Sequence, residues 1–132
     1  MKRSILMAAA LLLGASAAQA APVDDLLAEY QSQGAGPFSA KAGKTFWTKG
    51  FPNPDGGAAR SCATCHTGDP RKGGQHADTG KLIDPLAPSV NPQRLTDPAF
   101  MAKWLKRNGT WVTGAELSPQ IKGDVLTYLR NL

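Results

Sequence analysis

Cysteine is scarce in this chain, and its scarcity narrows the possible uses of the residues that are present. The 132 residues contain only Cys62 and Cys65, so the chain lacks the several cysteines of a disulfide-stabilised secreted domain. A bond between these two would close a very small loop and would stabilise little of the fold. The sequence therefore predicts that the two cysteines have another role.

Strong charge and large aromatic residues are also scarce. Without Lys2 and Arg3, 13 basic residues remain against 10 acidic ones, a net charge of +3. This excess is too small for a nucleic-acid surface, although it suits an encounter with an acidic redox partner. Aromatic residues make up 7% of the sequence, so the chain has little apolar surface of its own for a core.

No apolar run reaches the length of a membrane-spanning helix, about 20 residues. The longest, Ile5 to Leu13, follows Lys2 and Arg3 and is followed by Ala18-Gln19-Ala20. This is the three-part pattern of a secretory signal peptide with a cleavage site after Ala20. We therefore expect a signal peptide over residues 1–20, export to the periplasm, a single domain over 21–132 and no membrane span in the mature chain.

Hydrophobic periodicity and capping residues predict a helical protein with little strand. Ser39 is a candidate N-cap for the second helix, and Pro98 and Pro119 suit the first turns of the third and fourth. We expect the third helix to end near Asn108, with Gly109 as its C-cap. The four expected helices cover residues 23–33, 40–49, 98–108 and 119 to the C-terminal region.

The sequence "RSCATCHTGD" contains the attachment pattern of haem c. In Cys62-Ala63-Thr64-Cys65-His66 the two thiols form thioethers to the porphyrin, and the adjacent histidine ligates the iron. Cysteines one helical turn apart face the same way, so both reach one edge of the ring. A zinc site would need Cys62, Cys65, His66 and His76 together, and a redox dithiol would need a βαβ context; both are weaker interpretations.

A haem also explains the composition of the middle of the chain. About thirty residues rich in Gly, Pro, Asp and Asn separate the cysteine motif from the third helix. A loop of that length is unusual in a small domain unless it wraps around something. We expect one covalently bound haem to supply the centre of the core.

Residue spacing alone does not decide which residue is the second axial ligand of the iron. Met101 and Asn108 share one helical face but lie about 10 Å apart along the axis, so only one of them can reach the metal. Met101 is the usual type of ligand in an electron carrier, whereas Asn108 lies at the expected helix end. His76 lies in a polar, loop-like segment, and we expect it to be exposed and not to ligate iron.

Longer segments resemble a known family. The stretches "TGKLIDPLAPSVNPQRLTDPAF", "KWLKRNGTWVTGAELSP" and "DVLTYLRNL" are similar to the small oxygen-binding cytochromes c of the sphaeroides haem protein (SHP) family, to which the bis-histidine cytochrome c″ is related. The resemblance implies an all-α, class I cytochrome c fold of four to five helices around one haem. In that family the residue before the loop leaving the third helix is the distal ligand, which implies Asn108 here.

The resemblance also implies a function. An exported monohaem cytochrome with a labile Asn108 ligand would bind O₂ or NO at ferrous haem and exchange electrons with another cytochrome, such as a dihaem cytochrome c. The alternative is a plain electron carrier with His66 and Met101 on the iron. A dedicated enzyme, such as an NO dioxygenase or a peroxidase, would need a proton donor over the haem, for which no distal histidine is present. Relatives carry a disulfide that fixes this loop; the matching positions are interpreted here as Gly109 and Glu116.

Overall fold

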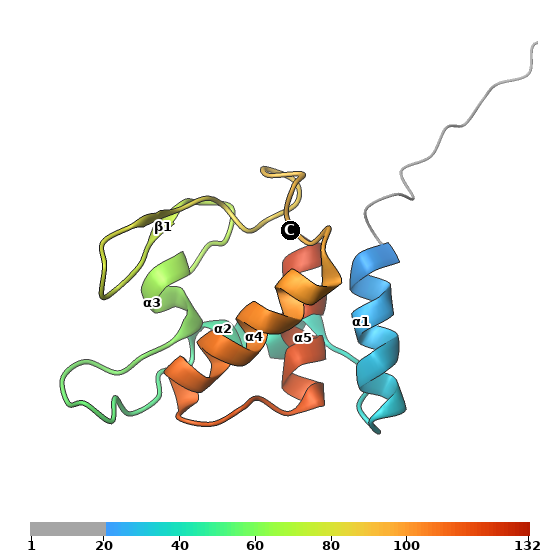
Figure 1. The fold of residues 1–132 in the computed structure, drawn as a ribbon, viewed down its shortest axis with the longest axis horizontal. Coiled ribbons are helices and arrows are strands. Elements are labelled where there is room, and N and C mark those ends of the chain that lie inside the picture. The colour runs from blue at the N-terminus through green and yellow to red at the C-terminus, as the bar shows by residue number, and fades with distance from the viewer. Residues whose placement is uncertain (1–20) are drawn as a thin grey trace, which may run out of the picture.

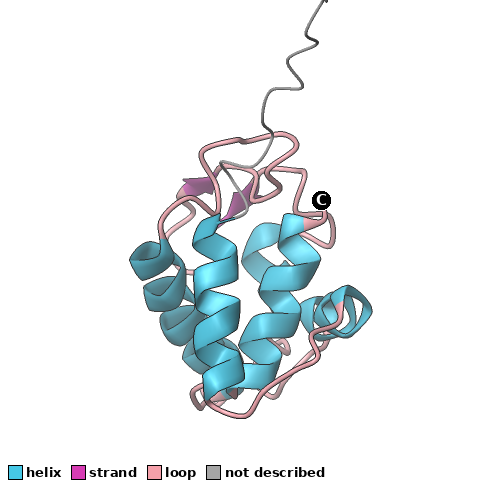
Figure 2. Ribbon diagram, turned by 90° about the vertical axis from the view of Figure 1, so that its right-hand side faces the viewer, coloured by secondary structure: helices cyan, strands magenta, loops and turns pink. Residues whose placement is uncertain are grey.

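The computed structural model describes residues 21–132, and the fold in that range is mostly helical (Figures 1 and 2). Residues 1–20, interpreted above as a signal peptide, lie outside the described part. Within residues 21–132 no helix has the length and apolar character needed to cross a membrane. The elements are α1 (Ala21–Ser32), α2 (Ala40–Thr48), α3 (Cys62–His66), β1 (Gly74–Gln75), β2 (Leu82–Ile83), α4 (Pro98–Thr113) and α5 (Pro119–Arg130).

Among the described helices, α2 and α5 pack most closely. A Cβ placed on Gly43 would lie 2.1 Å from the carbonyl oxygen of Asp124, so only glycine allows the two backbones to approach this closely. One turn later, the rings of Trp47 and Tyr128 meet edge to face at 6.0 Å. This crossing places the end of α2 beside the start of α3.

The buried side chains form two clusters on either side of α5. The first lies between α1, α4 and α5 and consists of Val23, Leu26, Leu27, Tyr30, Met101 and Leu126. The second lies at the α2–α5 crossing and consists of Trp47, Val125, Tyr128 and Leu129. Cys62 and Ala63 of α3 pack against the second cluster only. The position of the cysteine motif is therefore set by the α2–α5 side of the core.

Ser39 caps α2 as predicted, and α4 and α5 begin at the expected prolines, Pro98 and Pro119. Ser39, Asp97 and Ser118 each accept a backbone hydrogen bond from the first turn of α2, α4 and α5, respectively. In α4 and α5 a proline occupies the first turn, where its missing N–H leaves no hydrogen bond unmade.

The predicted end of α4 is wrong. The helix continues through Asn108 and Gly109 to Thr113, and Gly114 caps it in the left-handed conformation (φ 82°). Gly109 is buried inside the helix because Leu117 packs directly on its backbone. Close tertiary packing, and not helix termination, accounts for the glycine at this position.

Candidate functional site

The cysteine motif forms a single helical turn held by its flanking polar residues. The Ser61 backbone N–H donates to the Thr64 hydroxyl at 2.9 Å, and the Thr64 N–H donates back to the Ser61 carbonyl oxygen at 3.2 Å. This reciprocal capping fixes the turn between Cys62 and Cys65. Both cysteines are free and half-buried, so neither is committed to a disulfide.

The β1–β2 hairpin presses on the far side of this turn. A Cβ on Gly74 would lie 2.0 Å from the Cys65 carbonyl oxygen, so the hairpin backbone can approach α3 only at a glycine. The Ala77 N–H also donates to the Cys65 sulfur at 3.3 Å. Each strand is only two residues long, so no hydrophobic pattern predicts this contact, and the Gly73-Gly74 pair is its single local signal.

Burial sets the protonation of the two groups at either end of α3. It raises the pKa of the Cys62 thiol to about 12, so this thiol stays protonated at neutral pH. A protonated thiol is a poor nucleophile, which disfavours a redox-active Cys62–Cys65 pair. Burial, followed by the positive charge of Arg94, lowers the pKa of His66 to about 4. At neutral pH the imidazole is therefore uncharged, which is the form that binds a metal.

His66 is held in place through Trp47 of the core. The Trp47 and His66 rings lie 5.6 Å apart, and the indole Nε1–H of Trp47 donates to the carbonyl oxygen of Thr67 at 2.8 Å. Thr67 has a positive φ of 65°, a rare conformation for a residue with a Cβ. The chain therefore turns sharply just after His66, at a point fixed by Trp47.

The long loop after the hairpin folds back along this site. The Leu86 and Ala87 N–H groups both donate to the carbonyl oxygen of buried Pro70, at 2.9 and 3.1 Å. Arg94 donates from Nε to the Pro85 carbonyl oxygen at 3.0 Å and from Nη2 to that of Asp84 at 3.1 Å. These backbone contacts give the loop a defined course and bring the Arg94 charge near His66.

The two candidates for the second iron ligand lie in different surroundings on α4. Met101 is 6% exposed and packs among the α1 residues of the first cluster, away from Cys62. Asn108 is half-buried, two turns further along, and its side-chain amide forms no hydrogen bond within residues 21–132. Leu105, one turn before Asn108, packs against both clusters, so this part of α4 faces the side of the core that carries α3.

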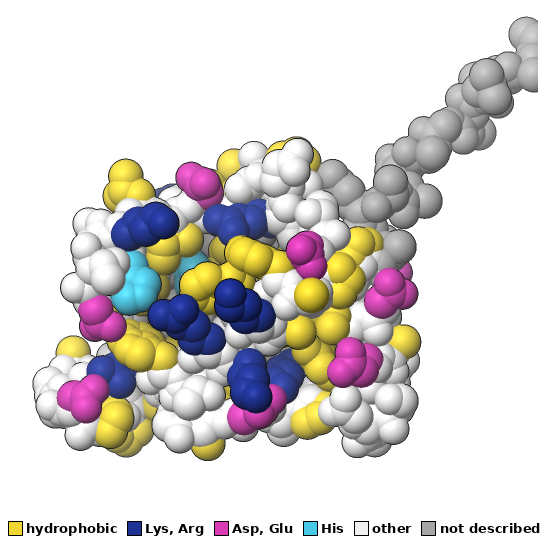
Figure 3. Space-filling model, viewed as in Figure 1, with side chains coloured by type: hydrophobic (Ala, Val, Ile, Leu, Met, Phe, Trp, Pro, Cys, Tyr) yellow, Lys and Arg dark blue, Asp and Glu magenta, His cyan; other side chains and the backbone are white. Residues whose placement is uncertain are grey.

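His76 lies in the hairpin that covers Cys65 and is half-buried, not fully exposed as expected. Its Nδ1 accepts hydrogen bonds from the Asp78 and Thr79 N–H groups, at 3.2 and 3.3 Å. These bonds tie the ring into its own turn. Figure 3 shows the two histidines on one face of the molecule, beside hydrophobic side chains and several Lys and Arg residues.

The turn after α4 is held without a disulfide. A Cβ on Gly109 would lie 2.5 Å from Leu117 Cγ, so Leu117, and not Glu116, is the residue that faces Gly109. Glu116 instead points to Lys122 at 2.7 Å and Lys106 at 3.9 Å. The hydrogen bond and positive charge of Lys122 lower the pKa of Glu116. Apolar packing and an ion pair therefore hold this turn, where the resemblance implied a disulfide.

These residues suit a covalently attached haem. Two free cysteines and a neutral imidazole lie on one turn. The core cluster against which Cys62 packs is also contacted by half-buried apolar side chains from three separate segments: Phe46, Leu86, Leu95 and Leu105. Apolar side chains that remain half-buried in a small domain are well placed to cover a flat hydrophobic group. Within residues 21–132 no three His, Cys, Asp or Glu side chains form a cluster that would hold a metal ion, so the zinc interpretation has no support.

Comparison with known proteins also points to a c-type cytochrome. Residues 33–129 match a family described as a domain of unknown function, DUF1924. The chain is 38% identical to the cytochrome c-type protein SHP of Cereibacter sphaeroides over 98% of both chains, and 39% identical to cytochrome c″ of Methylophilus methylotrophus over 66% of this chain and 60% of that one.

Solved structures resemble the fold over the same region. The structure of oxidised SHP, described as an oxygen-binding cytochrome c, matches with a TM-score of 0.74 and 38% identity, covering 83% of this chain and 96% of that one. Oxidised cytochrome c″ from Methylophilus methylotrophus matches with a TM-score of 0.72 and 31% identity, covering 83% of this chain and 94% of that one.

Proposed function

Since the chain belongs to the cytochrome c family that includes SHP and cytochrome c″, we propose that it binds a diatomic gas at a haem whose distal ligand, Asn108, is released on reduction. As a member of this family, the chain is an SHP-like, monohaem c-type cytochrome with a class I fold. The ligand set, the gas and the electron-transfer partner belong to the proposal.

The residues of α3 would hold the cofactor. Cys62 and Cys65 would form the two thioether bonds, and the neutral His66 imidazole would bind the iron. When bound, the haem would supply a redox-active iron that can take a small ligand. Trp47 and the sharp turn at Thr67 keep His66 on its side of the ring.

The unpaired amide of Asn108 is the observation that carries the proposal. The Asn108 amide forms no hydrogen bond among the described residues, and it is not one of the buried polar atoms that lack a partner, so it is open to solvent and free to bind an added group. An amide oxygen is a hard, weak donor that suits ferric iron and is poorly matched to the softer ferrous iron. We therefore expect the Asn108 side chain to leave on reduction, which opens a place for O₂, NO or CO. The free amide N–H groups would then be available as hydrogen-bond donors to the gas.

Met101 lacks the setting of a ligand in a plain electron carrier. It would have to leave a cluster of six buried side chains, and moving a buried side chain of this size into a new position opens a cavity that costs about 2–5 kcal/mol. Electrons would come from another cytochrome, and the resemblance suggests a dihaem cytochrome c. We also propose that the chain is exported to the periplasm, where haem c is attached.

Absorption spectra of the holoprotein test this function. We expect the oxidised protein to lack the weak band of sulfur-ligated ferric haem, the reduced protein to be high-spin, and CO to convert it to a low-spin form. A reduced spectrum that is already low-spin and does not change under CO would instead establish the electron carrier with Met101 on the iron.

A further inference from the structure

Trp104, on α4, has an indole N–H that no protein group accepts. Its Nε1 is buried and has no hydrogen-bond partner within residues 21–132, whereas the Trp47 Nε1 donates to Thr67. A buried donor without an acceptor costs about 1–3 kcal/mol, so native proteins rarely leave one. The acceptor for Trp104 is therefore expected to come from a group other than the polypeptide.

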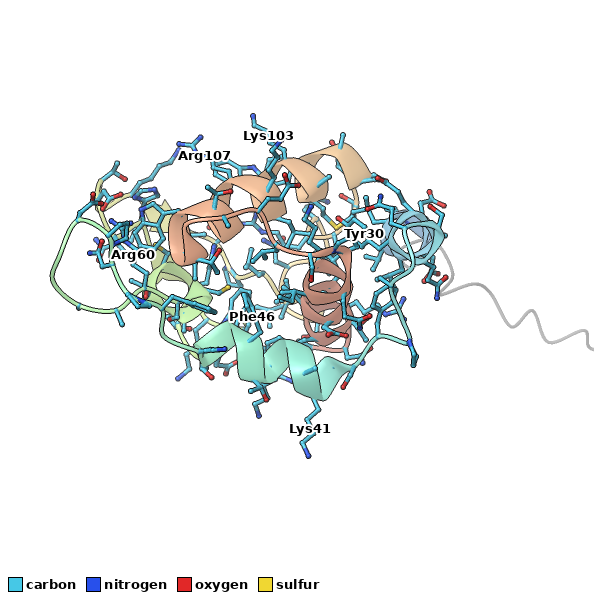
Figure 4. The ribbon with its side chains drawn as sticks, turned by 90° about the horizontal axis from the view of Figure 1, so that it is seen from below. Tyr30, Lys41, Phe46, Arg60, Lys103 and Arg107 are labelled. Carbon is cyan, nitrogen blue, oxygen red and sulfur yellow. The ribbon has the colours of Figure 1, made fainter. Side chains whose placement is uncertain are left out.

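The charges beside Trp104 indicate an anionic acceptor. Lys103 Nζ lies 5.9 Å from the centre of the Trp104 ring, and Arg107 Cζ lies 5.2 Å from it. Both side chains project from the outer side of α4 (Figure 4). Neither forms a salt bridge with an acidic residue among those described. Two cations and an N–H donor on one turn suit a carboxylate.

The position of Trp104 along α4 indicates which carboxylate this is. The last turns of α4 lie at the cysteine end of the site, where Arg60 Cζ stacks 4.3 Å above the ring of Trp111. Trp104 precedes Trp111 by two helical turns, so it lies about 10 Å further along α4 from the cysteine end of the site. A haem attached through Cys62 and Cys65 has its thioether bonds at one edge of the ring and its two propionates at the opposite edge.

We propose that the Trp104 indole N–H, with the cations of Lys103 and Arg107 beside it, binds a propionate of the haem. Arg94, the cation whose charge acts on His66, already donates to the Pro85 and Asp84 carbonyl oxygens and is less free for this role. The inference rests on the haem attachment in the proposed function but not on gas binding or on Asn108. It adds a cofactor-binding residue that the attachment motif does not contain.

Two Raman measurements on the holoprotein test this assignment. Trp104→Phe keeps an aromatic ring and removes only the N–H donor, and Trp111→Phe on the same helix is the matched control. The indole band that reports hydrogen bonding contains a bonded component from Trp47, which donates to Thr67. We expect this bonded component to weaken in Trp104→Phe and to keep only the Trp47 contribution, because the bonded Nε1–H of Trp104 is lost. With excitation in the haem band, the propionate bending mode should shift in Trp104→Phe and stay unchanged in Trp111→Phe.

A second pair of variants leaves the indole in place. Arg107→Gln should shift the propionate mode in the same direction as Trp104→Phe, and Lys106→Gln, which removes the exposed cation paired with Glu116, should not. This pair decides the question if Trp104→Phe fails to fold.

Retention of haem on a denaturing gel separates the two proposals. If no haem is retained, the proposed function itself fails. If haem is retained and the propionate mode is unchanged in Trp104→Phe and Arg107→Gln, the assignment of Trp104 alone is overturned. A change in the C–O stretching frequency of the CO complex without a change in the propionate mode would also overturn it, since Trp104 would then act on the distal ligand.

Discussion

Gly109 and Leu117 lie in direct contact across the turn that follows α4, with no room for a side chain on Gly109. Gly109 is the neighbour of Asn108 in the chain, so this contact fixes the backbone that carries the proposed distal ligand. The same turn carries the Glu116–Lys122 ion pair, whose charged atoms lie 2.7 Å apart. This pair is exposed to solvent, and exposed ion pairs add little stability. The apolar contact is therefore the stronger restraint on this turn.

We expect Gly109→Ala to destabilise the fold by about 1–3 kcal/mol, because the new Cβ would overlap Leu117 Cγ. Leu117→Ala should cost about 2–5 kcal/mol through the cavity that it leaves. The double variant should be less unstable than the sum of the two, since the added methyl group enters that cavity. Urea unfolding of the holoproteins measures all three. Strict additivity would show that the two residues do not share one packing site.

Asn108→His should give a low-spin haem that resists gas binding. An imidazole is a stronger ligand for ferrous iron than an amide oxygen, so it should remain in place after reduction. We expect CO binding to slow by at least about tenfold, which corresponds to a ligand held about 1.4 kcal/mol more tightly. Stopped-flow mixing of the reduced protein with CO measures the rate. Binding as fast as in the wild-type protein would argue against Asn108 as the distal ligand.

Met101→Leu should leave the oxidised and reduced spectra almost unchanged, because Met101 packs in the cluster with α1. The swap conserves volume, and its cost should stay below about 1.5 kcal/mol. Absorption spectra and thermal unfolding of the variant are the measurements. Loss of the low-spin ferric signal in this variant would assign the sixth position to the methionine sulfur.

Gly43→Ala should be among the most destabilising single methyl additions in the chain. The new Cβ would lie 2.1 Å from the Asp124 carbonyl oxygen and 2.8 Å from Tyr128 Cβ, so α2 and α5 would have to separate. We expect a loss of about 3 kcal/mol in the free energy of unfolding, at the upper end for overpacking. Gly68→Ala is the control: no atom lies within 4 Å of its added Cβ, and its effect should stay within about 0.5 kcal/mol.

The helix starts were predictable because their signals are local. Ser39, Asp97 and Ser118 each accept a hydrogen bond from the N–H three residues later, so the pattern is visible in the sequence. The end of α4 was not, since Asn108-Gly109 looks like a C-cap and only the contact with Leu117 shows otherwise. The fold class, confirmed by the similarity to SHP and cytochrome c″, followed from long segments of the sequence.

The candidate site was predictable only in part. The attachment motif identifies Cys62, Cys65 and His66 by spacing alone, although their role as haem ligands stays a prediction. The Trp47 bond to Thr67 and the unpaired Trp104 depend on which atoms of distant segments surround each ring. Such surroundings are a property of the folded chain and have no signature in the sequence.

The bond between Trp47 and Thr67 makes the molecule mechanically asymmetric. It ties the His66 side of the site to the α2–α5 crossing, which is the most closely packed pair of helices in the described chain. The Asn108 side is anchored by a leucine and an exposed ion pair. Strain that arises at the centre of the site would therefore relax toward α4 and the turn behind it, while the other half of the protein acts as a rigid base.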